Sequence, residues 1–299
     1  MAGVSAPAAP VIAYRGARHL QLGPVAIIAD DRPDSEILPE FFAGYDRAFV
    51  LPDEKEPLDG FRACLALNAR SFDFAPGPRR EIVLVARDAT SGERVGGVNL
   101  FATRIGGRIA VALNYLYVEA AQRGRGLLAT LIEATQWAAH SYLDATEDPV
   151  SVFIEQNDPL RMSAESYAAD SRHSGIDQVA RLEIWGRAGA RLVDIDYVQP
   201  ALSAGQGDDH TLAYGALRHD GDAIDGAFLA AHLASFFGVS VLKGRDPRTA
   251  EVAQSQIAAA QARDRIALLP LLPAAAYLRT LDHPSGAGSL IALARKLAR

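Results

Sequence analysis

Apolar and polar positions alternate along the chain with two periods, one typical of strands and one typical of helices. Three stretches rich in Val, Ile, Leu and aromatic residues follow one another, with Ser91-Gly92 and Gly106-Gly107 as the turns between them, which predicts an antiparallel run. The predicted strands cover residues 25–29, 81–87, 95–104, 109–118, 150–155, 191–199 and 211–218. The predicted helices of the same part cover residues 34–50, 57–70, 127–143 and 178–188, with an irregular or helical segment at 160–177.

This order predicts a mixed α/β fold: a mostly antiparallel central sheet, flanked by helices, in which an antiparallel half is followed by β–α–β crossings. Residues 1–20 are expected to be a loose arm, and residues 21–218 the main domain. From about residue 221 the pattern becomes helical and rich in alanine. Residues 219–299 are therefore expected to be a C-terminal helical extension, either a cap over the site or a dimerisation element. Its candidate helices are 228–237, 250–262, 274–281 and 290–297.

One junction between a strand and a helix stands out. The strand ends near Val118, the residues Arg123-Gly124-Arg125-Gly126 follow, and Leu127, Leu128, Leu131 and Ile132 then recur at helical spacing. A glycine turn that opens a helix directs backbone N–H groups and the positive end of the helix dipole at one point. The junction is therefore a candidate site for phosphate.

Composition narrows the classes of function. The chain has 299 residues and a formal charge of −6, which argues against nucleic acid as a main partner. Its one cysteine, Cys64, lies in a helical apolar pattern and is expected to be a core residue, and the seven histidines lack metal-ligand spacing, so no metal is expected. No segment reads as a signal peptide or a membrane span, which predicts a soluble, cytoplasmic protein without a membrane partner.

Over residues 20–218 the chain resembles the GNAT superfamily of acyl-CoA-dependent N-acyltransferases. Arg123 and Gly126 fit its pyrophosphate motif, whereas Leu128 stands where a small residue is usual. The resemblance implies that backbone amides hold the coenzyme A pyrophosphate, those of Gly124, Arg125, Gly126, Leu127, Leu128 and Ala129. It also implies that the strand edge at Tyr117 and Val118 binds the pantetheine arm, and that this strand splays from residues 150–155 to admit the thioester.

Two further landmarks of the family can be placed on the chain. Asn157, after the strand at 150–155, matches an Asn that contacts the cofactor arm, although it also suits a turn before Asp158-Pro159. Trp185 occupies the place of a tyrosine that often reprotonates the departing thiolate. Tyr167, Tyr117 or a water would then be the acid, or the thiolate would leave unaided, since thiols titrate near pH 8.5.

An amine that attacks a thioester must lose a proton, so a base is expected. Glu155 and Glu119 stand at the ends of the two splayed strands, and Glu155 is preferred because burial at the cleft would raise its pKa. Asn114 is a candidate for orienting a water. The acceptor site implied by the family draws on regions that carry acidic residues suited to a cationic amine, namely Asp53, Glu54, Glu56, Asp194 and Asp196.

The leading hypothesis is an N-acetyltransferase that moves an acetyl group from acetyl-CoA to a primary amine of a small molecule or peptide, by direct attack in a ternary complex. One alternative keeps the fold but uses a longer acyl-CoA or a carrier-protein thioester, as Leu128 and the extension would allow. Another is a non-catalytic acyl-CoA sensor or scaffold. The chain could also form a homodimer, and the sequence leaves this possibility open.

Overall fold

The strands of the protein form one ten-stranded sheet, in the order β1-β2-β3-β4-β5-β6-β8-β7-β10-β9. The computed structural model describes residues 16–49, 55–202, 205–282, 284–286 and 288–298. The strands are β1 (Arg18–Leu22), β2 (Val25–Asp30), β3 (Arg79–Asp88), β4 (Arg94–Ile105), β5 (Arg108–Val118), β6 (Val150–Asn157), β7 (Arg191–Val193), β8 (Leu212–Leu217), β9 (Ala223–Asp225) and β10 (Arg265–Pro270).

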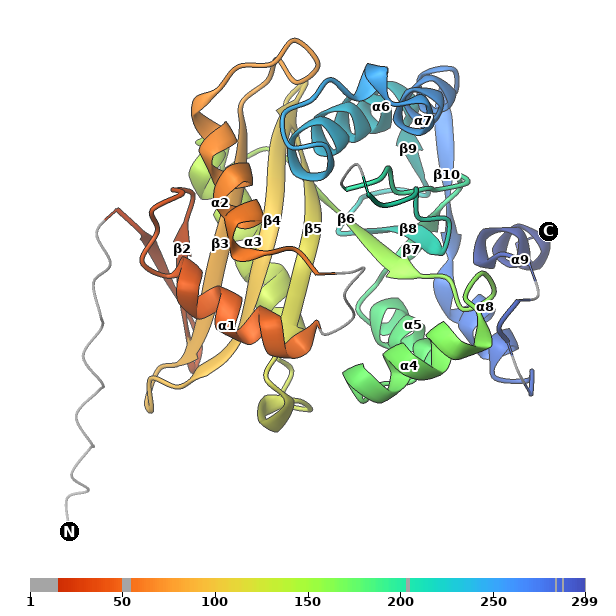
Figure 1. Cartoon of the computed structure of the whole chain (residues 1–299), viewed down its shortest axis with the longest axis horizontal. Helices are drawn as coiled ribbons and strands as arrows, with labels where there is room; N and C mark the ends of the chain where they lie inside the picture. Colours follow the sequence, from red (N-terminus) through yellow and green to blue (C-terminus); the bar gives the residue numbers. More distant parts are fainter. Residues whose placement is uncertain (1–15, 50–54, 203–204, 283, 287, 299) are drawn as a thin grey trace.

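Helices cover both faces of this sheet. In Figure 1, α1 and α2 lie in front of strands β2–β5 and α3 lies behind them. The helices are α1 (Leu38–Ala48), α2 (Leu58–Ala66), α3 (Leu127–Leu143), α4 (Ala164–Ser174), α5 (Gln178–Arg187), α6 (Gly226–Phe236), α7 (Glu251–Gln261), α8 (Leu271–Leu278) and α9 (Leu290–Leu297). A short π-helical turn, η4 (Phe237–Val241), continues α6.

Alternation along the central strands divides the core between the two faces. On β3, Ile82 and Leu84 pack in the cluster that contains Leu131 of α3. Val83, which points to the other face, packs with Phe41 of α1. The period of two in the strands and the apolar stripes of the helices therefore account for the three-layer arrangement.

Neighbouring strands pair antiparallel throughout the sheet except for β5 and β6, which are parallel. Their register ends at the pair Leu113 and Ile154, although both strands continue beyond it. At the same point two residues of β5, Leu113 and Asn114, lie opposite the single residue Leu100 of β4, which is a β-bulge. Bulges bend a strand and end its pairing, so β5 and β6 part from here onward. Figure 1 shows β6 running away from β5 toward α4 and α5.

The fold class predicted from the sequence, a mostly antiparallel mixed sheet flanked by helices, is confirmed. The predicted loose arm is wrong for its last residues, because Arg18–Leu22 form β1 and pair with β2, while residues 1–15 lie outside the described part. The strand predicted at 191–199 ends at Val193. The irregular or helical segment at 160–177 contains α4.

The C-terminal segment is largely helical, as predicted, but it also adds two strands to the sheet. β10 pairs with β7 on one side and with β9 on the other. At the start of α6 a Cβ atom on Gly226 would lie 1.7 Å from the carbonyl oxygen of Arg263, so this contact requires glycine. The division of the chain at residue 218 stays a prediction, because the sheet and its core continue across it.

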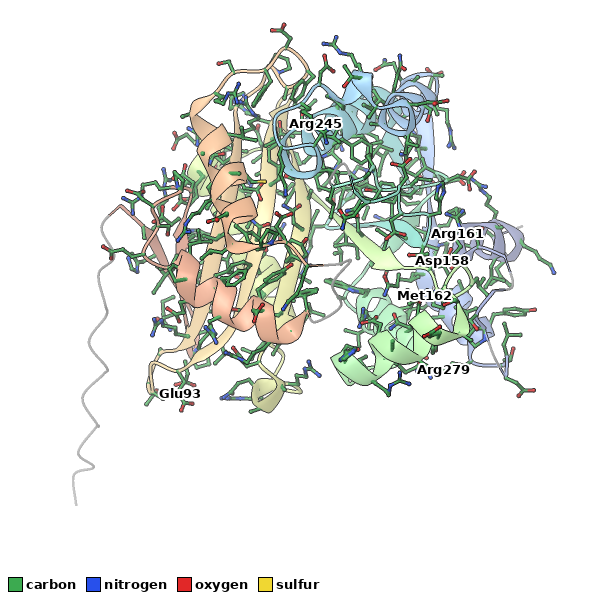
Figure 2. The ribbon with its side chains drawn as sticks, in the orientation of Figure 1. Glu93, Asp158, Arg161, Met162, Arg245 and Arg279 are labelled. Carbon is green, nitrogen blue, oxygen red and sulfur yellow. The ribbon has the colours of Figure 1, made fainter. Side chains whose placement is uncertain are left out.

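Polar contacts also join the C-terminal helices to the rest of the molecule. The carboxylate of Asp158, just after β6, accepts a hydrogen bond from the N–H of Leu290 at the start of α9, 2.8 Å away (Figure 2). Arg279, after α8, pairs with Glu183 of α5 at 2.9 Å. Within the described ranges, every helix is too short or too polar to cross a membrane.

Candidate functional site

A cavity of about 490 Å³ opens where β5 and β6 part. Its walls include residues 113–118 of β5 and 154–157 of β6, both at and beyond the last residue pair of the two strands. The glycine turn before α3 and the helices α4 and α5 close one side, and α2 and η4 contribute to the other. The parting of the two strands, which the resemblance implied, therefore creates this cavity.

The glycine turn forms one end of the cavity. Gly124 and Gly126 have φ angles of +81° and +77°, and nothing lies within 4 Å of where their Cβ atoms would be. Gly126 is the N-cap of α3, so the N–H groups of the next residues, Leu127 and Leu128, find no partner inside the helix. The amide of Ala129 differs, because its N–H already donates to the carbonyl of Gly126 at 3.1 Å. The open donors of the turn therefore end at Leu128.

The two arginines of the turn point in different directions. The guanidinium of Arg123 lines the cavity and donates to the carbonyl oxygen of Ser174, at the end of α4, at 2.9 Å. Arg125 is exposed and contacts Gln122 and Asp88. Arg123 therefore joins the turn to the wall made by α4, whereas Arg125 faces the outer surface.

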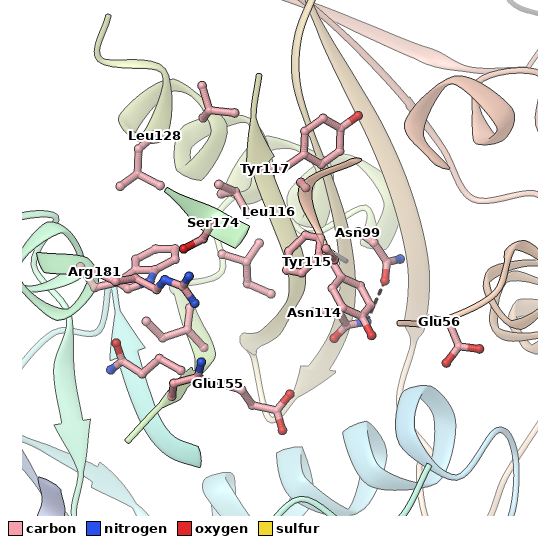
Figure 3. Close-up of a pocket in the computed structure, with 18 of the residues that line it drawn as sticks. Glu56, Asn99, Asn114, Tyr115, Leu116, Tyr117, Leu128, Glu155, Ser174 and Arg181 are labelled. Carbon is pink, nitrogen blue, oxygen red and sulfur yellow. Dashed lines mark hydrogen bonds between the residues drawn. The ribbon is translucent and has the colours of Figure 1, made fainter. Parts of the chain in front are cut away.

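The three landmark residues of the resemblance, Leu128, Asn157 and Trp185, all line the cavity. The side-chain amide of Asn157 donates to the carboxylate of Asp170 at 2.9 Å, so its N–H group is already engaged. Trp185 packs partly buried against the α3 side of the core. Figure 3 shows Leu128, Ser174 and Arg181 on one side of the cavity and Asn114 and Glu56 on the other.

Gln156 is a polar residue of the site that the sequence analysis missed. Its side chain is 4% exposed and lines the cavity, yet neither its Nε2 nor its Oε1 finds a hydrogen-bond partner among the described residues. A buried amide without partners is costly, and such groups are usually satisfied by a ligand or water. The sequence offered only a weak signal, since Gln156 lies between Glu155 and Asn157 in a polar end of the strand.

Glu155 lies on the side of the cavity away from the glycine turn. Its carboxylate accepts hydrogen bonds from the hydroxyl of Tyr197 and from Nε2 of Gln199, the latter at 3.1 Å. Burial raises the pKa of Glu155 to about 7, with the nearby Asp209 adding to the shift. In Figure 3 the carboxyl group of Glu155 extends toward the side on which Asn114 lies.

A second buried carboxyl group, Glu81 at the start of β3, faces the same cavity and was also missed. Asn99 and Asn114 donate to its Oε1 at 2.8 and 3.0 Å, and the hydroxyl of Ser240 donates to its Oε2 at 2.9 Å. Burial raises the pKa of Glu81 to about 7. The run at 81–87 predicts only a strand, and no local pattern distinguishes its first residue from a charge at a strand end.

No family model matches the sequence of this chain, and neither does any curated protein. Among solved structures, a protein assigned to the GNAT acetyltransferase family from Bacteroides thetaiotaomicron matches with 13% identity, a TM-score of 0.42, and coverage of 70% of this chain and 92% of that one. An aminoglycoside 6′-N-acetyltransferase complexed with coenzyme A matches with 16% identity, a TM-score of 0.38, and coverage of 64% and 95%.

A GNAT-family protein from Desulfovibrio desulfuricans matches with 16% identity, a TM-score of 0.37, and coverage of 65% and 98%. The parted parallel pair and the glycine turn have the arrangement that the resemblance implied. The described part of the chain has a mostly antiparallel mixed sheet, flanked by helices, whose one parallel pair parts beside a glycine turn.

The acidic residues assigned to the acceptor site divide into three groups. Asp53 and Glu54 lie outside the described residues. Glu56 lines the cavity, and its carboxylate pairs with Lys243. Asp194 and Asp196 do not line the cavity as described. Both pair with Arg295 of α9, and they are better explained as anchors of the C-terminal segment.

Two catalytic candidates also lie elsewhere. Glu119 does not line the described cavity, and its carboxylate pairs with Arg47 at 2.9 Å and Arg94 at 2.8 Å. Two guanidinium groups therefore already engage this carboxylate. Tyr167 likewise lies outside that lining, and its hydroxyl donates to Asp177 at 2.5 Å, while burial raises its pKa to about 12. The structure therefore does not bring either residue to the lining of the described cavity.

The remaining residues of the site support it structurally. Tyr117 packs its ring beside α1, and its hydroxyl donates to the carbonyl of Phe41 at 3.1 Å, so its contribution to the cavity is through the strand. Cys64 is buried, and burial raises the pKa of its thiol, in keeping with a packing role. Among the described residues no group of three His, Cys, Asp or Glu side chains could hold a metal ion, and the absence of a metal stays a prediction.

Proposed function

We propose that the protein is an N-acyltransferase that moves an acetyl group from acetyl-CoA to a primary amine. One observation carries the proposal: a single cavity at the parting of β5 and β6 has open helix-terminal amides at one end and buried carboxyl groups with raised pKa at the other. The first end suits a phosphate-bearing donor, and the second suits a basic acceptor.

The donor side fits coenzyme A in charge and in hydrogen bonding. The pyrophosphate would lie on the amides between Gly124 and Leu128, where both glycines leave the backbone open to close approach. The pantetheine arm would follow the edge of β5 that β6 leaves free after Leu113. The arm itself contains amide groups, and the buried amide of Gln156, without partners among the described residues, can both donate to and accept from such a group.

The acceptor side of the cavity supplies the group that accepts the proton of the amine. An incoming ammonium gives a proton to the carboxylate of Glu155, and the nitrogen lone pair attacks the thioester carbonyl. The new C–N bond forms, the C–S bond breaks, and the sulfur leaves as a thiolate with the bonding electron pair. The product nitrogen loses its second proton, and the thiolate takes up one proton, directly or through solvent. Tyr167 does not line the described cavity, and the thiolate needs no dedicated acid, since thiols titrate near pH 8.5 and a thiolate is a stable leaving group.

The test is acyl transfer by the purified full-length protein. Acetyl-CoA is mixed with a panel of small amines and short peptides, and free thiol and acetylated product are measured together. We expect thiol release that depends on the amine and equals the acetylated product. Thiol release only with a longer acyl-CoA or a loaded carrier protein would favour that donor instead. Tight acetyl-CoA binding with no release from any donor would contradict catalysis and favour a sensor.

A further inference from the structure

The acceptor side of the cavity holds more carboxyl groups than the proposed reaction needs. Glu81, Glu155 and Asp209 all contribute to its wall, and no ion pair within the described part of the chain neutralises any of them. The ammonium of Lys243 pairs with Glu56, another carboxyl group that lines the cavity. A buried carboxylate without a counter-ion is expensive, so a ligand that brings positive charge would be favoured here.

The surroundings of Glu81 indicate the kind of group that would fit. Its carboxylate has about four acceptor positions, and Asn99, Asn114 and Ser240 occupy three of them. The Oδ1 atom of Asn114 is buried and accepts no hydrogen bond from any described residue. The orientation of that amide is fixed, because its Nδ2 already donates to Glu81 and to Oδ1 of Asn99, the latter at 3.1 Å.

One acceptor position of Glu81 and the Oδ1 atom of Asn114 therefore remain without a donor among the described residues, on two side chains that are joined by the 3.0 Å hydrogen bond from Nδ2 of Asn114 to Oε1 of Glu81. An ammonium group brings three donors and one positive charge, so it can satisfy both oxygens and neutralise the carboxylate. A hydroxyl group brings only one donor and no charge. Glu155, the base of the proposed reaction, lies on the neighbouring strand in the same cavity. In Figure 3 Asn114 lies on the side of the cavity toward which the carboxyl group of Glu155 extends.

We infer that the acceptor carries two amino groups: one ammonium binds between Glu81 and Oδ1 of Asn114, while the other amine faces Glu155 and attacks the thioester. This inference rests on the proposed acetyltransferase function. It assigns Glu81 and Asn114 to acceptor specificity rather than to proton transfer. It also gives the C-terminal segment a part in the site, because Ser240 of η4 holds one oxygen of Glu81.

The experiment compares three acceptors of equal chain length with the full-length protein and acetyl-CoA: a straight-chain α,ω-diamine, the amino alcohol and the monoamine. Several chain lengths are tested, and kcat/KM is measured from thiol release. We expect the best diamine to exceed the monoamine by at least about tenfold, as is typical of a buried hydrogen bond to a charged group. Without such a site the order would reverse, because the cavity would favour the apolar tail of the monoamine.

The variant Glu81→Gln keeps the shape of the side chain and removes its charge. We expect it to lower the ratio of kcat/KM for diamine over monoamine by about tenfold or more. Asn114→Leu, which removes the open acceptor at similar volume, should lower the ratio in the same direction. Asp59→Asn is the matched control, because it removes one negative charge from the exposed face of α2 and should leave the ratio unchanged. Thermal unfolding and acetyl-CoA binding verify that each variant is folded.

The possible results distinguish a failure of this inference from a failure of the proposed acetyltransferase function. If no amine releases thiol, the acetyltransferase proposal fails and the inference fails with it. If all three acceptors react with similar efficiency, or if the amino alcohol equals the diamine, the transferase stands and the second-ammonium site is wrong. An unchanged ratio in a folded Glu81→Gln variant would also overturn it.

Discussion

Gly126→Asp is expected to abolish binding of coenzyme A, with a loss of affinity of at least about a hundredfold. The residue is the N-cap of α3, and its φ of +77° places it in the left-handed region. The space around it is open, so the aspartate fits sterically. Its carboxylate would then lie among the amides that are proposed to receive the pyrophosphate, and it would both repel the phosphates and take up their donors. Isothermal titration calorimetry with coenzyme A measures the effect.

Two control variants separate charge from backbone strain. Gly126→Asn has nearly the same shape, tolerates a positive φ and carries no charge, so it should retain most of the affinity. Gly106→Asp places the same aspartate at a φ of +55° in the turn between β4 and β5, which does not line the described cavity, and should leave affinity unchanged. Unaltered binding in Gly126→Asp would reject the phosphate assignment. Equal losses in the Asp and Asn variants would attribute the effect to the backbone.

Glu155→Gln is expected to lower turnover by about a hundredfold or more near neutral pH, the usual contribution of a general base. In the wild-type protein kcat/KM should rise with pH through about 7 and then level off, because the carboxyl group, whose pKa burial raises to about 7, must be ionised to accept a proton. The variant can use only amine that is already neutral, so its rate should keep rising toward the pKa of the amine. The deficit should therefore shrink at high pH.

Glu119→Gln provides the comparison. Glu119 was the other candidate base, and it forms ion pairs with Arg47 and Arg94 away from the cavity. The Glu119→Gln variant should keep the rise of kcat/KM with pH near pH 7. We attribute this rise to the ionisation of Glu155, whose surroundings also include Tyr197, Tyr214 and Asp209. A folded Glu155→Gln variant with the wild-type pH profile would show that another group, such as Glu81, accepts the proton.

Most of the fold could be predicted from the sequence, because local signals specify it. Glycine turns between β-rich runs located β3, β4 and β5, and helical spacing after Gly126 located α3 to its last residue. β1 was missed because Arg18–Leu22 is half polar and is held as a strand by pairing with β2. β9 and β10 were missed because short strands depend on their neighbours, and Arg265–Pro270 lies within an apolar run that also suits a helix.

The site was only partly predictable, and the difference follows from distance along the chain. The glycine turn and Glu155 are adjacent to elements that the pattern defined, so both could be proposed. Glu81 and Ser240 meet across 159 residues, and only the folded chain brings the π-helical turn to the start of β3. Asp194 was misplaced for the converse reason, since its partners Arg263 and Arg295 come from the far end of the chain.

The most direct measurement of the central claim is a crystal structure of the protein with coenzyme A. The account predicts the pyrophosphate on the amides between Gly124 and Leu128, the pantetheine arm between β5 and β6, and its amides within hydrogen-bonding distance of Gln156. The sulfur should point toward Glu155. Coenzyme A bound elsewhere, or with its pyrophosphate away from this turn while the cavity stays empty, would contradict the account.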